Sequence, residues 1–347
     1  MDKTVKIHYY NNAVGERKDF ELILAALKNI CKIIVFDETT TLESSYINGV
    51  KNYIFDENTN DTIIDVGIFS NVFYKPNLME NIKTKILILN EEWLYHQNLA
   101  DVSNYDYVVV KSQYAKKLVS PFSKNVKILY FWSIDRYDSS IQEQKKQLHL
   151  AGLSIQKGTE SLVHKKNITV VDASDRFNGS ACNYINHYLS EDEINTYMNS
   201  HNLHICPSLY EAHGHYMFEG LSCGKSIICT KIPVWQECID PDMVNFIDVR
   251  ETENDVDGYR KQYIKSYRLH APISDTKYQY MSNISHFNYI EANKFPLRKA
   301  FIFDEEELDE KIKKHKNDKF SEKRRNYCLD LYEKRKKEFQ NFIVDLL

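Results

Sequence analysis

The stretch Leu203–Thr230, LHICPSLYEAHGHYMFEGLSCGKSIICT, decides the expected fold of the chain around it. An apolar strand (Leu203–Cys206) leads into a polar loop and a helix, Gly224 ends that helix, and a second apolar strand (Ser226–Thr230) follows. A strand–loop–helix unit directs backbone N–H groups and the positive end of the helix to one point beyond the strand, where phosphate binds well. The stretch therefore predicts an α/β domain with a ligand site at the carboxyl edge of its sheet.

Two glutamates of this stretch are candidates for ligand contacts. Glu211 lies in the loop, and Glu219 lies eight residues later, in what is predicted to be the first turn of the helix. A carboxylate cannot bind phosphate, because like charges repel, so these side chains are expected to hold sugar hydroxyls. Phosphate and hydroxyls together indicate a sugar nucleotide. The alternative is an ordinary loop residue and a helix N-terminal charge stabilised by the helix dipole.

The composition is typical of a globular protein with two domains. The 347 residues are 43% hydrophobic and 27% charged, and chains of this length usually form domains of about 150 residues. A net charge of −4 argues against a protein that coats nucleic acid. The N-terminus has no apolar leader and no apolar run is long enough to span a membrane, so a cytoplasmic location is expected. The seven cysteines form no C-x-x-C pair and are expected to be reduced thiols.

Predicted strands and helices alternate along the chain in two series. This alternation predicts two Rossmann-like domains with parallel sheets, residues 1–135 and 147–320, joined by a polar linker at 136–146. The first series predicts strands at 3–10, 32–37, 63–69, 85–90, 107–111 and 127–131. The second predicts strands at 147–151, 168–172, 182–188, 203–206, 226–230 and 245–249. Ser190 and Glu193 predict a helix that starts with a capping box.

The second domain carries the most specific candidates. Lys157 follows a glycine-containing turn at an expected helix start that leads to His164, so its ammonium and the helix N–H groups could hold a diphosphate. Gly214 lacks a Cβ and lets the loop backbone approach a ligand closely. Glu219 could accept two hydrogen bonds from a ribose diol. A solvated lysine is the alternative interpretation of Lys157.

Other candidates carry less information. Asn90 and Glu91 end a predicted buried strand of the first domain and are expected to be catalytic or acceptor contacts, with a structural strand end as the alternative. The lysine-rich helices predicted at 304–316 and 321–347 present either a solvated face or a basic face for peripheral membrane contact. The opening stretch holds several histidines and cysteines: His204, Cys206, His213, His215 and Cys223. Their spacing matches no standard zinc motif, so no metal is expected.

Residues 147–238 resemble the donor domain of glycosyltransferase family 4 (group 1), which has the GT-B fold. The matching segments are LHLAGLSIQKGT at Leu148–Thr159, YLSEDEI at Tyr188–Ile194, HICPS-x2-EAHGHYMFE at His204–Glu219 and VWQE at Val234–Glu237. The resemblance implies two Rossmann-like domains facing each other across a cleft. It also implies that the C-terminal helix, at about 321–347, crosses back to the N-terminal acceptor domain.

The resemblance also implies roles for individual residues. Glu219 would bind the nucleotide ribose, Lys157 the diphosphate, and Glu211 would lie near the transferred sugar. Asn90 and Glu91 join the candidate catalytic residues from their position at a strand end, not from the resemblance. The implied donor-binding residues are Gly15, Ser154, Lys157, Gly158, His213, Gly214, His215, Tyr216 and Glu219. Many members of the family have an arginine shortly before the lysine, whereas this chain has Gly152-Leu153-Ser154.

The function implied is transfer of a sugar from a nucleotide diphosphate sugar to a glycan, lipid-linked or protein acceptor. By the resemblance, the reaction retains the anomeric configuration and needs no metal or other cofactor. The missing arginine motivates an alternative, a non-catalytic protein of the same fold that binds a sugar nucleotide or glycan. Transfer of sugar to nucleic acid is a third hypothesis, and the net charge argues against it.

Overall fold

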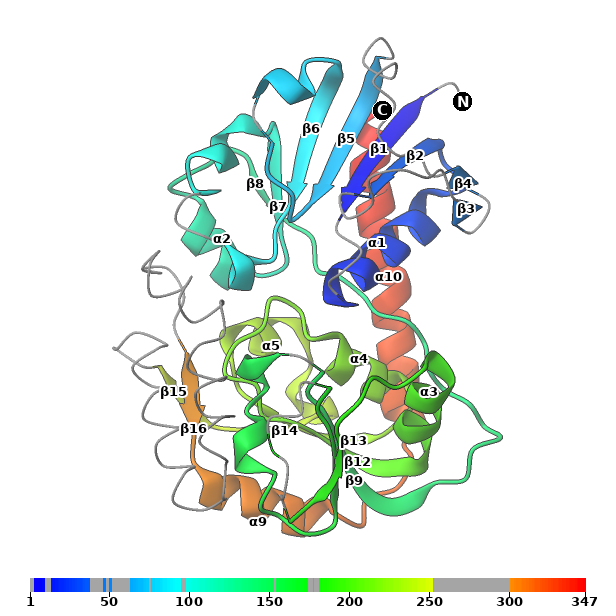
Figure 1. Ribbon diagram of the computed structural model, residues 1–347, viewed down its shortest axis with the longest axis vertical. Coiled ribbons are helices and arrows are strands. Elements are labelled where there is room, and N and C mark those ends of the chain that lie inside the picture. Colours follow the sequence, from blue (N-terminus) through cyan, green and yellow to red (C-terminus); the bar gives the residue numbers. More distant parts are fainter. Residues whose placement is uncertain are drawn as a thin grey trace. The chain divides into compact units, whose positions relative to one another are not determined.

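The chain divides into two compact units. The first consists of Met1–Ser133 with Leu331–Leu347, and the second of Ile134–Asp330. The computed structural model describes residues 3–9, 14–37, 46–47, 50–51, 63–74, 76–94, 98–152, 154–173, 177, 181–251 and 300–347. Each unit contains a six-stranded sheet in which every pair of neighbouring strands is parallel (Figure 1). None of the described helices is long and apolar enough to cross a membrane.

The sheet of the first unit has the strand order β2-β1-β5-β6-β7-β8. Its strands are β1 (Thr4–Tyr9), β2 (Lys32–Asp37), β5 (Ile64–Ser70), β6 (Ile82–Ile88), β7 (Tyr107–Val110) and β8 (Val126–Ile128). The unit also contains α1 (Val14–Leu27), α2 (Gln113–Val119) and a small antiparallel pair, β3 (Tyr46–Ile47) and β4 (Val50–Lys51). The central strands are buried on both faces, as is usual when helices cover a parallel sheet.

The C-terminal helix α10 (Glu322–Leu346) supplies the last segment of the first unit. The ring of Phe339 lies 5.7 Å from that of Trp132, measured between centroids. Arg335 donates a hydrogen bond of 2.7 Å to the carbonyl of Phe131, and Gln340 donates one of 2.7 Å to the carbonyl of Ala26. These contacts tie the second half of α10 to the end of α1 and to the segment that follows β8.

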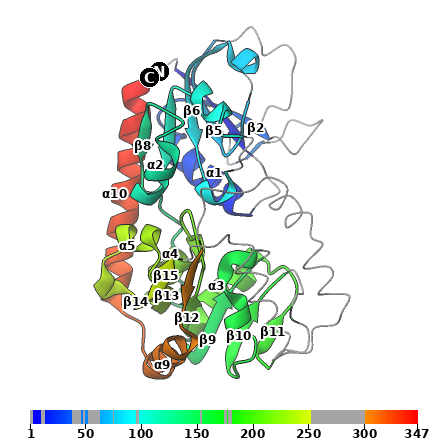
Figure 2. The ribbon, with the colours of Figure 1, turned by 90° about the vertical axis from the view of Figure 1, so that its left-hand side faces the viewer.

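The sheet of the second unit has the order β11-β10-β9-β12-β13-β14, which Figure 2 shows from β14 to β11. Its strands are β9 (Gln144–Leu150), β10 (Ile168–Val171), β11 (Asn183–Ile185), β12 (His201–Cys206), β13 (Ser226–Thr230) and β14 (Asn245–Ile247). Among the described residues its helices are α3 (Glu191–Ser200), α4 (His215–Ser222), α5 (Pro233–Cys238) and α9 (Glu305–His315), and a two-stranded pair joins β15 (Val249–Glu251) to β16 (Phe301–Phe303).

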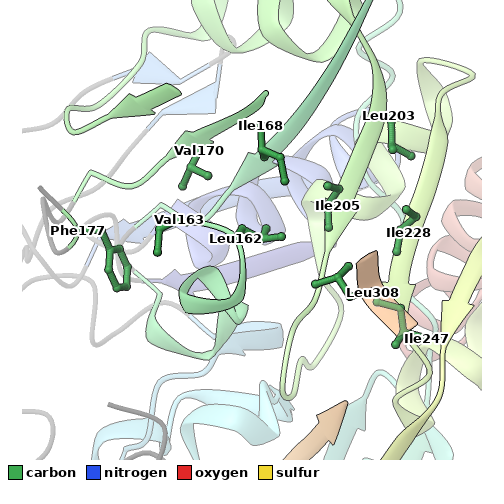
Figure 3. Packing of buried hydrophobic residues seen from close by; sticks show 10 residues of the cluster. All are labelled: Leu162, Val163, Ile168, Val170, Phe177, Leu203, Ile205, Ile228, Ile247 and Leu308. Atoms are coloured by element: carbon green, nitrogen blue, oxygen red, sulfur yellow. The ribbon is translucent and has the colours of Figure 1, made fainter. Parts of the chain in front are cut away.

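The core of the second unit gathers apolar side chains from the sheet and from α9. Figure 3 shows Leu308 of α9 packed with Ile205 and Ile247 of the sheet, all three fully buried. Burial of each such side chain contributes about 1.5–3 kcal/mol. This packing holds β12 in the centre of the sheet, so that its carboxyl end is a rigid support for the loop that follows.

Most predicted elements are confirmed, and the two α/β sheets agree with the expected fold class. The predicted capping box is present, since Ser190 Oγ accepts from Glu193 N while Glu193 accepts from Ser190 N. The helix predicted to lead to His164 is wrong, because the chain forms two 3-10 turns there, Ile155–Lys157 and Thr159–Ser161. Gly158 between them has a left-handed conformation that no α-helix accommodates.

Two further expectations are corrected by the structure. Residues 136–146, predicted to be a linker, belong to the second unit, where β9 begins at Gln144. Within this segment Glu143 forms an ion pair of 2.7 Å with Lys225. Glu219 lies in the second turn of α4 rather than the first, because the helix begins only at His215.

Candidate functional site

The strand order of the second sheet places the loops that follow β9 and β12 side by side. From β9 the chain proceeds to β10 and β11 on one side, and then places β12 on the other side of β9. Parallel sheets bind ligands at such a switch point, beyond the carboxyl ends of the strands. Lys157 follows β9 and Glu211 follows β12, so both predicted residues lie at the switch point.

Lys157 and Glu211 form an ion pair there. The ammonium of Lys157 donates to Oε1 of Glu211, which also accepts a hydrogen bond of 2.7 Å from Ser208 Oγ. The Glu211 side chain is 4% exposed and that of Lys157 is 18% exposed. The loops are joined by their backbones as well, since Leu209 N donates to Gln156 O over 2.8 Å. The structure therefore brings together a cation and a carboxylate that are 54 residues apart.

Two glycines fix the backbone around this pair. Gly158 has φ +64° and packs so closely that a Cβ would lie 2.1 Å from the carbonyl oxygen of Pro207. Gly214, at the start of α4, has φ +84°, and a Cβ there would lie 2.8 Å from the ring of Trp235. Trp235 Nε1 donates a hydrogen bond of 2.9 Å to His213 O, which holds the loop in this shape. Only glycine satisfies both the conformation and the space at these positions.

Replacing Gly158 by alanine should destabilise the protein more than the same change at Gly152. Both residues have positive φ, but a Cβ at Gly152 would meet nothing within 4 Å. Gly152→Ala should therefore lower the free energy of unfolding by about 1 kcal/mol, from backbone strain alone. Gly158→Ala should lower it by about 1–3 kcal/mol more, because the chain must also relieve the contact with Pro207. Urea unfolding of both variants measures the difference, and equal losses would contradict the close packing.

The other predicted residues of the α4 segment differ in what their side chains do. The hydroxyl of Tyr216 donates a hydrogen bond of 2.7 Å to the carbonyl of Leu148, and burial raises the pKa of this phenol, so it stays neutral. The His213 ring stacks on Phe218 at 4.5 Å. These side chains therefore support the loop, and a ligand role for His213, Gly214, His215 and Tyr216 rests on their backbone groups at the helix start.

Glu219 is held by an arginine that sequence reasoning missed. Arg136 Nε donates to Glu219 Oε2 over 2.8 Å, and the two side chains are 2% and 1% exposed. Arg136 Nη1 also contacts Asn195 Oδ1 and Glu191 Oε2, at 2.8 and 2.9 Å. Burial lowers the pKa of Arg136, but the Glu219 and Glu191 carboxylates more than offset this and raise it, so the guanidinium stays charged. The predicted ribose contact is thus half of a buried ion pair.

Ser154 lies in the second unit and Gly15 in the first, each at the start of a helical turn. Ser154 precedes the 3-10 turn of Lys157 and makes no side-chain cap bond, while its N–H donates to Ala151 O over 3.2 Å. Gly15 lies exposed in the first turn of α1, at the carboxyl edge of the first sheet. A Cβ at Gly15 would meet nothing within 4 Å, so packing does not demand glycine there.

Asn90 and Glu91 lie at the carboxyl edge of the first sheet, where both are 7% exposed. Asn90 Oδ1 accepts a hydrogen bond of 2.6 Å from Lys111, whose ammonium also donates to Asp19 Oδ2 over 2.5 Å. The Lys111 ammonium lies 4.2 Å from the ring centroid of Phe131. Sequence reasoning missed Asp19 and Lys111, although a lysine directly after the buried strand YVVV could have signalled the cluster.

Glu16 of α1 completes this polar edge. Its Oε1 accepts a hydrogen bond of 2.9 Å from Asn71 Nδ2. The pKa of Glu16 is raised from 4.5 to about 7, and burial is the largest cause. The hydrogen bond from Asn71 and the Lys111 ammonium lower the pKa, whereas the Asp19 and Glu92 carboxylates raise it. Glu16 is therefore a carboxyl group that changes its charge near neutral pH.

The Glu16→Gln variant should gain stability relative to the wild type as the pH rises. A carboxyl with a raised pKa stabilises the folded state fully below its ordinary pKa of 4.5, and this contribution is lost as the pH rises through about 7. The loss amounts to about 3 kcal/mol for a shift of this size. Urea unfolding of both proteins across this window measures the change, with the exposed Glu21→Gln as the control. A difference that does not grow with pH would contradict the raised pKa.

Apart from His215, which is half-buried, the histidines and cysteines of the opening stretch are buried core residues. Burial lowers the pKa of His204 to about 3, and its Nε2 lies 3.1 Å from the carbonyl of Met198. Burial raises the pKa of Cys223 to about 12, so its thiol is unreactive at neutral pH. All seven cysteines are free. Within the described ranges, no group of three or more His, Cys, Asp or Glu side chains is placed to hold a metal ion.

The two parallel-sheet units, with six strands each, form the GT-B glycosyltransferase fold. A structure of trehalose-6-phosphate synthase matches with a TM-score of 0.60 and 9% identity, over 99% of this chain and 98% of that one. Sucrose-phosphate synthase from Thermosynechococcus elongatus matches with a TM-score of 0.54 and 11% identity, over 84% and 94%. A glycosyltransferase from Rickettsia africae matches with 0.54 and 10%, over 96% and 98%. No protein-family model and no curated protein sequence matches this chain.

Proposed function

We propose that this protein transfers a sugar from a nucleotide diphosphate sugar to an acceptor. The observation that carries the proposal is the Lys157–Glu211 pair at the switch point of the second sheet, beside the glycine that starts α4. A cation and a helix start suit a diphosphate, and a carboxylate at the same point suits sugar hydroxyls. The GT-B fold supports this assignment, because it is the fold of the glycosyltransferases to which the chain is similar.

Each residue of the pair would have a separate part in the reaction. As the bond between the sugar and the diphosphate breaks, the electron pair stays with the diphosphate, whose negative charge grows. The Lys157 ammonium and the first N–H groups of α4 would stabilise that charge where it develops. Glu211 would hold Lys157 in place before the donor binds and accept hydrogen bonds from the sugar afterwards. Ser208 would keep the Glu211 carboxylate oriented.

Glu219 would contact the ribose together with Arg136. The carboxylate of Glu219 accepts hydrogen bonds, and Nη2 of Arg136 is buried without a hydrogen-bond partner in the described part of the chain. A ribose hydroxyl could donate to Glu219 and accept from Arg136, which would satisfy both groups. We further propose that the reaction proceeds with retention, as described for the trehalose-6-phosphate synthase, and without a metal, in the manner of glycosyltransferase family 4.

Two observations favour a second candidate function, a protein that binds a sugar nucleotide or glycan without transferring it. The charge of Glu219 is already balanced by Arg136, and no arginine stands at Gly152–Ser154 to assist Lys157. A diphosphate could then bind without enough charge stabilisation for its departure. Donor turnover in the presence of an acceptor library distinguishes the two, because a binding protein shows only slow hydrolysis.

A thermal-shift panel of UDP-, GDP-, ADP- and dTDP-sugars tests the proposed function. A ligand that binds only the folded protein raises its apparent stability by mass action, by about 2.7 kcal/mol at a hundredfold excess over Kd. At least one of these nucleotide sugars should raise the melting temperature, and Lys157→Met should reduce that rise. The absence of a shift with all four donors would overturn the proposal.

A further inference from the structure

The first sheet has a switch point of its own. The chain runs from β1 to β2 on one side and then places β5 on the other side of β1, so the switch lies between β1 and β5. The segment after β5 begins with Asn71, whose side chain contacts Glu16 of α1. The end of β5 and the start of α1 therefore form a polar edge at the position where parallel sheets bind ligands.

The register of the strands shows which side chains share this edge. Ile7 and His8 of β1 pair with Ile68 and Phe69 of β5, so Ser70 is the next partner, beside Tyr9. Side chains that pair in a parallel sheet point to the same face. The Tyr9 ring stacks on Phe20 of α1 at 3.8 Å, so Ser70 points to the face that α1 covers.

Buried polar atoms at this edge lack partners. Ser70 is 1% exposed, and its Oγ has no hydrogen-bond partner among the residues that the structure describes. The Oδ1 atom of Asn71 is likewise buried and unsatisfied in this part of the chain. A buried polar group without a partner destabilises the fold by about 1–3 kcal/mol, so such groups in native structures commonly serve a ligand or water.

The polar atoms at this edge are rich in acceptors, and Lys111, the cation paired with Asp19, is already engaged. Lys111 donates hydrogen bonds to Asp19 and to Asn90, and its ammonium lies over the Phe131 ring. These three contacts use the three N–H donors of the ammonium. The remaining groups are the Glu16 carboxyl, the Asn71 carbonyl and the Ser70 hydroxyl. Arg17, the next residue of α1, pairs with Glu21 at 3.8 Å. A phosphate at this edge would therefore meet the Glu16 and Asp19 carboxyl groups, while Lys111 and Arg17 already have acidic partners. A group that donates hydrogen bonds matches this set instead.

We propose that the edge formed by Glu16, Ser70 and Asn71 binds an uncharged polyhydroxyl group, the hydroxyl-bearing part of a neutral sugar, in preference to a phosphorylated sugar. Under the proposed function, on which this inference rests, the neutral sugar is the acceptor or its terminal unit. The Glu16 carboxylate and the Asn71 carbonyl accept from its hydroxyls, and Ser70 both donates and accepts. The chemistry of this edge therefore favours a neutral sugar over a sugar phosphate as the acceptor.

Saturation-transfer NMR on the full chain tests the site with glucose, galactose and mannose and with their 6-phosphates. At least one neutral sugar should give a signal, and its 6-phosphate should bind more weakly. Glu16→Gln and Ser70→Ala should each weaken the binding of that sugar by about tenfold, since each removes a buried hydrogen bond to the ligand. Glu21→Gln, an exposed change on the same helix, should leave binding unchanged.

Three results would overturn the inference: no signal from any of the neutral sugars, tighter binding of a 6-phosphate than of its parent sugar, or binding that survives both substitutions. The nucleotide-sugar thermal shift, measured on the same variants, separates this outcome from failure of the proposed function. A retained nucleotide shift with no effect of Glu16→Gln on sugar binding rejects the acceptor site alone. Sugar binding without any nucleotide shift rejects glycosyl transfer and leaves the sugar site standing.

Discussion

Lys157→Met should lower kcat/KM for sugar transfer by about a hundred- to a thousandfold, the usual effect of removing one group that stabilises charge in the transition state. Methionine keeps much of the length and apolar stem of lysine but removes the ammonium. The Glu211 carboxylate, which is 4% exposed, then loses its cation. Both consequences oppose departure of the diphosphate. Steady-state kinetics with the donor found in the thermal-shift panel measures the change.

The control for Lys157→Met is Lys231→Met. Lys231 also pairs with an acidic residue, Asp248 at 3.2 Å, but its side chain is 46% exposed. Exposed ion pairs contribute about 0–1 kcal/mol, and Lys231 is not among the candidate site residues, so kcat/KM should be unchanged. A Lys157→Met variant that folds normally and keeps wild-type kcat/KM would remove Lys157 from the mechanism.

Arg136→Met should lower the free energy of unfolding by about 3–5 kcal/mol, the usual cost of removing one partner of a buried ion pair. The substitution leaves the Glu219 carboxylate buried without its cation, and it also removes the contact with Asn195. Glu219→Ala should cost a similar amount, because it leaves the guanidinium uncompensated. Urea unfolding followed by tryptophan fluorescence measures both losses.

The double variant Arg136→Met with Glu219→Leu separates charge imbalance from the loss of packing. Apolar replacement of both partners of a buried pair is often neutral or stabilising, so the double variant should be more stable than either single variant. If the losses of Arg136→Met and Glu219→Leu, each measured alone, simply add in the double variant, the pair is not coupled. Because Glu219→Ala affects folding, the ribose role of Glu219 is better tested with Glu219→Gln, by comparing nucleotide affinity at matched stability.

Regular elements of this chain were predictable because their signals are local. The strands at Lys32–Asp37 and Ser226–Thr230 coincide with continuous runs of apolar, largely β-branched residues that end at polar ones. The capping box of Ser190 and Glu193 is likewise a pattern within four residues. The helix expected after Gly158 is absent because Gly158 adopts a left-handed conformation and packs against Pro207, a residue distant in sequence that no local pattern reveals.

The candidate sites were only half predictable, because their chemistry depends on pairs that are distant in sequence. Glu211 and Lys157 were found from their loops, but their contact with each other follows only from the strand order. Arg136 lies 83 residues before Glu219, in a polar segment without a pattern, and nothing local distinguishes it from a solvated arginine. Asp19 and Lys111 are 92 residues apart and meet for the same reason.

The first unit is built from two segments that are far apart in the sequence, and this has a consequence for synthesis on the ribosome. Residues 331–347 belong to this unit, and Phe339 packs against Phe131 and Trp132. Domains generally fold as units and begin to fold while the chain emerges. The second unit can therefore complete its fold before the first unit, although it comes later in the sequence. Until Phe339 is synthesised, Phe131 and Trp132 cannot pack against it. Premature termination before residue 331 should thus impair the N-terminal sheet rather than the unit that precedes the break.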